Sequence, residues 1–243
     1  MDVPFQEMCY TIHRGNEHSD SCESFYIIIY NIFFKFRSEK IEVCCSNILR
    51  NKMNIFALST DPKKAAEAHG DKHVVKMILE TCQMLYSAHW TGTYPELLKE
   101  RSSIKISKLA KTLQTPKHMK SAPLRKSGDI GFTPVHLHHP CTIWVRELHG
   151  NYMWAADLAL WLATEYEFRW PGRQHSCKAH AIWLKNHLPP NIDHGHRKTF
   201  AIAMDLKYKV EDPVQSYINF YKGSKKDRNL TNYTKREKPW FLE

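Results

Sequence analysis

The sequence predicts a mainly α fold, a compact single-domain helical bundle with one short strand near residues 53–58. Apolar residues recur at helical spacing through two long stretches, at about 62–90 and 141–169. Signals that start or stop helices flank these and later stretches, namely Asp61-Pro62, Pro171-Gly172, Pro189-Pro190 and Asp212-Pro213. A chain of 243 residues is also long enough to bury one substantial core.

Residues 1–52 differ in character from the rest of the chain. They show no sustained helical period, contain four of the seven cysteines and run directly into Met53. We interpret 1–52 as an N-terminal extension and 53–243 as the helical domain, with a small N-terminal subdomain as the alternative. The apolar run at 25–36 is shorter than the about 20 residues that span a bilayer, so no membrane association is expected.

The elements are expected in the following order. The buried strand at 53–58 precedes a helix over about 62–90, where Asp61 can cap the first turn and Pro62 can occupy its first position. Residues 101–128 hold eight Lys or Arg residues and no acidic one, which predicts a mobile basic insertion with one short helix near 104–113.

Further helices are expected after the insertion. The first runs from Cys141 to about Arg169, and the others cover about 175–187 and 212–221. Residues 191–209 read as irregular, and 222–243 form a basic, aromatic tail.

The net charge of +10 favours a polyanionic partner such as nucleic acid, although many basic proteins have no such partner. The cysteines are odd in number and form no CxxC pair, and no cleavable secretory leader is recognised. These features favour the cytoplasm or nucleus over secretion.

One helix edge carries the residues best suited to chemistry. His73, Lys76, Glu80 and Gln83 follow one another at spacings of three, four and three, so they form one polar edge between apolar faces. We interpret Asp71, His73, Lys76 and Glu80 as catalytic candidates beside a cleft. The alternative is a solvated helix face with an ordinary Lys–Glu ion pair.

The chemistry of this edge follows from its residue types. A desolvated lysine can act as a nucleophile, and a glutamate one turn away can move the proton. A histidine titrates near neutral pH and can shuttle protons. His69 and His73 also have the spacing at which two imidazoles can bind one metal ion, with a third ligand from Glu80, His139 or Cys141. No cofactor is predicted, and a divalent metal stays the alternative.

Substrate-binding candidates come from the same edge and from the second helical block. Amide and charged groups could hold a phosphate, and aromatic rings could stack on a nucleobase. The alternative is that the aromatic residues belong to the core. The candidates are Gln83, His139, Arg146, Asn151, Trp154, Glu165, Tyr166 and Arg169.

Several strings of residues stand out within 53–243. They include Met53-Asn-Ile-Phe, Asp71-Lys-His-Val-Val-Lys-Met-Ile-Leu-Glu80, His139-Pro-Cys-Thr-Ile-Trp-Val-Arg146, Asn151-Tyr-Met-Trp154 and Asp212-Pro-Val-Gln-Ser-Tyr217. Together they resemble a family of largely uncharacterised proteins from tailed phages and large DNA viruses. The resemblance covers nearly all of 53–243 and implies a viral origin, a single compact domain and a start equivalent to Met53. It implies no reaction, and it implies a shorter connection in place of the basic insertion.

The leading hypothesis is a viral nucleic-acid-processing enzyme, hydrolytic or glycosylase-like, that performs base excision, strand cleavage or base modification in an infected host cell. The alternatives are a non-catalytic basic nucleic-acid-binding protein and a metal-dependent hydrolase. A P-loop enzyme and a serine hydrolase with a Gly-x-Ser-x-Gly elbow are disfavoured, because the sequence has neither motif.

Overall fold

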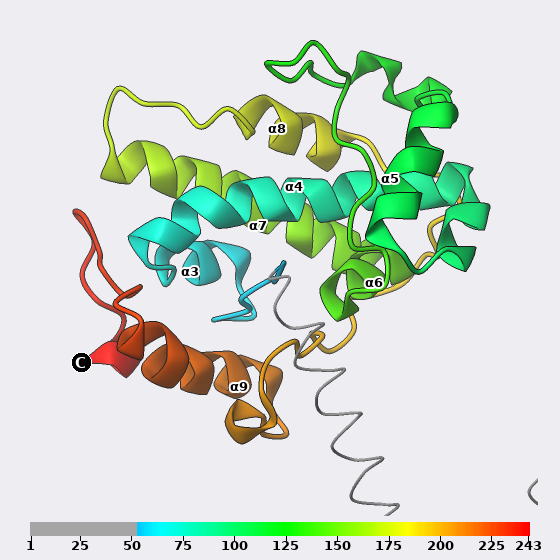
Figure 1. Cartoon of the computed structure of the whole chain (residues 1–243). Helices are drawn as coiled ribbons and strands as arrows, with labels where there is room; N and C mark the ends of the chain where they lie inside the picture. The colour runs from blue at the N-terminus through cyan, green and yellow to red at the C-terminus, as the bar shows by residue number, and fades with distance from the viewer. Residues whose placement is uncertain (1–52) are drawn as a thin grey trace, which may run out of the picture. The chain divides into compact units, whose positions relative to one another are not determined.

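Two long helices organise the part of the chain that the computed structural model describes, residues 53–243 (Figure 1). The chain divides into two units, Met1–Asn51 and Lys52–Glu243, and the expected extension lies outside the described residues. Helices α4 (Asp71–Thr93) and α7 (His149–Arg169) pack against each other, and three shorter helices pack against this pair. These are α3 (Pro62–Glu67), α6 (Pro140–Glu147) and α8 (Lys178–Asn186). The predicted mainly α fold is confirmed.

Shorter elements complete the described unit. Between α4 and α6 lie η1 (Pro95–Lys99), α5 (Ser103–Thr112) and η2 (Lys117–Ser121). After α8 come η3 (Leu206–Tyr208), α9 (Pro213–Phe220), the π-helical turn η4 (Tyr221–Lys225) and η5 (Trp240–Leu242). No helix within 53–243 is long and apolar enough to cross a membrane.

The strand expected at 53–58 is wrong, although the segment is buried. The N–H groups of Ala57 and Leu58 donate to the carbonyls of Ile55 and Phe56, two residues earlier, at 3.1 and 2.9 Å. These are tight local turns, and a strand would need a ladder partner instead. An apolar run indicates burial, but it does not distinguish between these two ways of using the backbone.

The helix expected over 62–90 is divided at Gly70, because the C-terminal segment crosses the chain at this point. A Cβ atom at Gly70 would lie 2.4 Å from the carbonyl oxygen of Leu230, so the crossing requires a glycine. The N–H group of Asp71, at the start of α4, donates to the carbonyl of Asn232 at 2.8 Å. A carbonyl far along the chain therefore accepts a hydrogen bond from one of the N–H groups that the start of a helix leaves without an intrahelical partner.

The second helical block is divided at Leu148, whose backbone is extended. The N–H groups of His149 and Gly150 donate to the carbonyls of Asp193 and Gly195, at 2.8 and 3.0 Å. The irregular segment after α8 therefore caps the N-terminus of α7, which has no side-chain cap of its own.

The other expected helices are present with shifted ends. α5 confirms the short helix within the basic insertion, and the burial of Met119 and Ala122 anchors the chain that follows it. α8 begins at Lys178. α9 begins as expected, because the Asp212 carboxylate accepts a hydrogen bond from the Val214 N–H group at 3.0 Å.

Candidate active site

An ion pair between Lys76 and Glu80 lies at the centre of the polar edge of α4. The Lys76 Nζ atom is 2.7 Å from the Glu80 Oε1 atom. The two side chains differ in burial: that of Lys76 is 53% exposed, whereas that of Glu80 is 8% exposed. The pair therefore joins a carboxylate inside the protein to an ammonium group that solvent can reach.

The segment before α3 holds the other oxygen of Glu80. The backbone N–H group of Asn54 donates to the Glu80 Oε2 atom at 3.3 Å. The Asn54 side chain is fixed in turn, because its Nδ2 atom donates to the Ala203 carbonyl at 2.8 Å and its Oδ1 atom lies 3.0 Å from the Tyr217 hydroxyl. Burial raises the pKa of Glu80, and the hydrogen bonds from Lys76 and Asn54 only partly oppose this effect.

His73 lies one turn before Lys76 and is buried. Its Nδ1 atom is 2.7 Å from the Tyr221 hydroxyl, and its ring packs against that of Phe56 with centroids 4.9 Å apart. Burial, helped by nearby positive charges including that of Lys225, lowers the pKa of His73 to about 2. His73 is therefore neutral at physiological pH.

Cationic side chains gather around His73 and Glu80. Lys225, Lys76 and Arg228 all lower the pKa of His73, and Lys225 also acts on the Glu80 carboxylate. Lys225 is buried, with its Nζ atom 4.9 Å from the centroid of the Phe56 ring. Three cationic groups thus act on the neutral imidazole of His73, and two of them, Lys76 and Lys225, also act on the Glu80 carboxylate. Positive charge of this kind favours an anionic ligand.

Asp71, Glu165 and Arg169 come together in a separate ion-pair network. The buried Arg169 side chain contacts the Asp71 Oδ1 atom at 2.9 Å and the Glu165 Oε1 atom at 2.7 Å. Arg236 of the C-terminal segment contacts the Glu165 Oε2 atom at 2.6 Å, and the Thr234 hydroxyl donates to the Asp71 Oδ2 atom at 2.9 Å. This arrangement links the C-terminal segment to α4 and α7.

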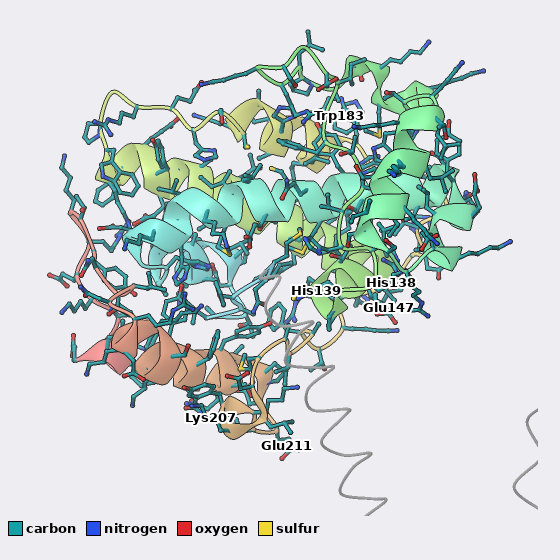
Figure 2. All side chains as sticks on the ribbon, viewed as in Figure 1. His138, His139, Glu147, Trp183, Lys207 and Glu211 are labelled. Carbon is teal, nitrogen blue, oxygen red and sulfur yellow. The ribbon has the colours of Figure 1, made fainter. Side chains whose placement is uncertain are left out.

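Three of the substrate-binding candidates bind the protein's own backbone. His139 is the N-cap of α6, where its Nδ1 atom accepts a hydrogen bond from the Cys141 N–H group at 3.2 Å. Arg146 donates to the Leu137 carbonyl. Asn151 is fully buried; it donates to the Trp144 carbonyl at 2.8 Å and accepts from the Lys198 N–H group at 2.8 Å. Figure 2 shows His139 at the start of α6, whereas Trp183 of α8 lies on the other side of α4 in this view.

The aromatic candidates and Gln83 lie in different surroundings. Trp154 is buried, packs against Phe200 with ring centroids 4.6 Å apart and donates to the Thr60 carbonyl. Tyr166 is half-buried and packs against Trp170. Gln83 is half-buried on the polar edge of α4. The structure therefore places Trp154 in the core, as the alternative interpretation expected.

The four metal-ligand candidates do not form one cluster. His69 is buried with its Nδ1 atom 2.6 Å from the Ala65 carbonyl, and the Cys141 sulfur lies 3.4 Å from the Asn54 Oδ1 atom. His73 and His139 have the partners given above. Within residues 53–243, no group of three or more His, Cys, Asp or Glu side chains is arranged to hold a metal ion.

Sequence reasoning did not identify three residues of the site, namely Asn54, Tyr221 and Lys225. Asn54 lies in a segment that the sequence assigned to a strand, and the other two lie in η4, far along the chain from α4. The resemblance strings include Asn54, which is the signal that could have identified it. No local pattern marks Tyr221 or Lys225.

No protein-family model, no curated protein and no solved structure matches this chain.

Proposed function

We propose that this chain is an enzyme that acts on nucleic acid or its nucleotide building blocks, with Glu80 as the proton carrier and Lys76 as the amine that meets the substrate. The Lys76–Glu80 pair carries the proposal. The Glu80 carboxyl group is buried and has a raised pKa, whereas the Lys76 side chain is about half exposed. The Lys76 Nζ atom lies 2.7 Å from the Glu80 Oε1 atom. A carboxyl group with a raised pKa is a stronger proton acceptor than an exposed one, as general acid–base catalysis requires.

The Lys76–Glu80 pair suits base excision better than strand cleavage or base modification. The Glu80 carboxylate takes a proton from the Lys76 ammonium, and the free amine attacks the sugar carbon C1′. The bond from C1′ to the base breaks, and its electron pair leaves with the base. Glu80 then delivers its proton to the departing base, and a Lys76–sugar ammonium adduct remains. The C1′–O4′ bond of this adduct breaks and O4′ takes one N–H proton, which leaves a free hydroxyl and the iminium that borohydride reduces.

The positive surroundings support an anionic substrate. Lys225 acts on the Glu80 carboxylate, and Lys225 and Arg228 both act on His73 one turn earlier, which favours a phosphate group near the reacting sugar. The resemblance to phage and large-DNA-virus proteins supports a viral setting, in the cytoplasm or nucleus of an infected host cell.

A product screen with the full chain tests the proposal. The chain is incubated with damaged, modified and unmodified oligonucleotides and with nucleotides, and the products are identified by mass spectrometry in the presence and absence of borohydride. We expect a borohydride-trapped adduct that Lys76→Gln abolishes and that Glu80→Gln slows by at least about 100-fold. Lys72→Gln, one turn earlier on the exposed side of α4, is the matched control and should react as the wild type.

Two outcomes would refute this assignment. One is that every substrate stays unchanged, and the other is that Glu80→Gln reacts at the wild-type rate. Nucleic-acid affinity with a steep salt dependence, unaffected by substitutions in the pair, would instead support the non-catalytic binding protein.

A further inference from the structure

The positive charge of the chain is concentrated in one segment. Residues 101–128 contain eight of the 35 basic residues and none of the 25 acidic ones. This segment therefore supplies eight of the ten net positive charges, and the rest of the chain is nearly neutral. A partner attracted by the net charge should meet this segment first.

The structure exposes five of the six lysines of this segment on two consecutive elements. On α5, Lys105, Lys108 and Lys111 follow at three-residue spacing and are exposed, while Ile106 and Ala110 are buried. On η2, Lys117 and Lys120 are exposed on either side of the buried Met119. We call the set Lys105, Lys108, Lys111, Lys117 and Lys120 the basic face.

Side chains tie the basic face to the helical core. The His118 Nε2 atom of η2 lies 2.9 Å from the Nδ1 atom of His89, which is buried in α4. The Trp183 Nε1 atom of α8 donates to the Ser121 hydroxyl of η2 at 3.0 Å. Figure 2 shows Trp183 beside this part of the chain. Because the backbone is anchored in this way, its lysines can be held in place before a partner arrives.

Few carboxylates neutralise the basic face. The Lys105 Nζ atom is 3.9 Å from the Glu100 Oε2 atom, a long contact in which the Lys105 side chain is 72% exposed and that of Glu100 is 28% exposed. Among the residues that the structure describes, Lys108, Lys111, Lys117 and Lys120 form no ion pair. Their charge is therefore available to a partner.

We infer that the basic face is a contact surface for the backbone of a nucleic-acid strand, separate from the Lys76–Glu80 pair. Lysines three residues apart on a helix place a charge about every 4.5 Å, which suits a partner with repeated charges better than a single phosphate group. An anionic membrane fits less well, since a helix that binds a bilayer inserts its apolar side, and Ile106 and Ala110 on that side of α5 are buried in the protein, with Ile104 exposed.

The inference rests on the proposed function in one respect: it specifies the substrate as a strand and not a single nucleotide. α5 lies near the C-terminal end of α4 (Figure 1). This end of α4, Thr93, is 13 residues beyond Glu80, which corresponds to roughly 20 Å along α4. A strand of about six nucleotides covers that distance, at about 3.4 Å per nucleotide. A mononucleotide reaches one of the two surfaces only.

Fluorescence anisotropy with the full chain tests the inference. The probes are a labelled oligonucleotide of roughly 20–25 nucleotides, single-stranded and duplex, and a labelled nucleoside triphosphate, at roughly 50–200 mM salt. We expect Lys105→Gln/Lys108→Gln/Lys111→Gln to weaken oligonucleotide binding by at least about tenfold at the lowest salt and to reduce the salt slope by about 3. Binding of the triphosphate should not change.

A control variant makes the result specific. Lys64→Gln/Lys235→Gln/Lys238→Gln removes three exposed lysines outside the basic face and should bind as the wild type. Catalysis by Glu80→Gln is measured separately: a wild-type rate in that variant would refute the proposed function and leave this inference intact. The inference is overturned if both triple variants weaken binding equally, if neither does, or if no oligonucleotide binds. Phosphatidylserine vesicles are a further probe. If the triple variant of the basic face loses binding to these vesicles and still binds the oligonucleotide, the partner is a membrane and the inference is overturned.

Discussion

Arg169 is a buried cation held by an ion-pair network between α4 and α7. Its side chain is buried and bonded to Asp71 and Glu165, at 2.9 and 2.7 Å. A buried charge that loses its partner retains the cost of desolvation, whereas an exposed pair contributes little. The network therefore stabilises the fold that supports the polar edge of α4.

We predict that Arg169→Met lowers the free energy of unfolding by about 3–5 kcal/mol. Urea denaturation followed by tryptophan fluorescence measures it, because all seven tryptophans lie in 53–243. The control is Lys185→Met, which breaks the Lys185–Asp157 pair, whose side chains are about a third exposed, and should cost less than about 1 kcal/mol. Equal losses in the two variants would contradict a special role for the buried network.

His139 makes stability depend on pH. Burial lowers the pKa of His139 from 6.5 to about 4. At a pH between these two values, His139 is protonated in the unfolded chain and neutral in the folded chain. The free energy of unfolding should therefore fall as the pH decreases from about 6.5 to about 4.

The substitution His139→Asn separates this titration from helix capping, since asparagine also caps a helix. We predict that the variant keeps its stability at pH 7. In acid, its free energy of unfolding should fall less steeply with decreasing pH, by the equivalent of up to about one bound proton. Urea denaturation across this pH range measures both. His194→Asn, at an exposed histidine, is the control, and an unchanged slope in His139→Asn would rule out the assignment.

At the scale of elements, the start of α4 depends on the C-terminal segment. We predict that Gly70→Ala costs about 1–3 kcal/mol of stability, because its Cβ atom would meet the Leu230 carbonyl at 2.4 Å. The variant should also release the C-terminal segment to proteases, as limited proteolysis with mass spectrometry would show. Gly128→Ala has open space around its Cβ atom but a φ of +85°, so it costs stability through backbone strain alone and should leave that segment protected. A protected segment in Gly70→Ala would show that the crossing can shift without cost.

The sequence predicted helices well wherever local signals mark them. Asp61 and Asp212 cap the helices that their positions predicted, and the short helix in the basic insertion is present. It did not predict the breaks at Gly70 and Leu148, because chain segments distant in sequence cause both. The segment 53–58 was assigned to a strand because burial alone does not reveal whether a ladder partner exists.

At the scale of the whole molecule, the candidate site is only partly visible in the sequence. The Lys76–Glu80 pair follows from helical spacing, and the structure has its two atoms 2.7 Å apart. The residues that bury Glu80 and add charge beside it, Asn54 and Lys225, lie on other elements. Their approach depends on how α4 packs against the segment before α3 and against η4, which no local pattern specifies.

The basic face and the Lys76–Glu80 pair are expected to have different roles. The basic face would supply affinity for a strand, and the Lys76–Glu80 pair would supply the reaction. Raised salt should therefore weaken substrate binding while the rate of the fully bound complex stays nearly constant, because an interaction with exposed charges is screened more than a buried one.

The pH dependence of the single-turnover rate, measured on fully bound oligonucleotide, shows whether Glu80 carries the proton in the reaction. Glu80 must be ionised to take the proton of Lys76, and burial raises its pKa above 4.5. We expect a rate that rises with pH through an inflection above 4.5, and a slow rate without this inflection in Glu80→Gln. An inflection that persists in Glu80→Gln at the wild-type rate would contradict the role of Glu80 as the proton carrier.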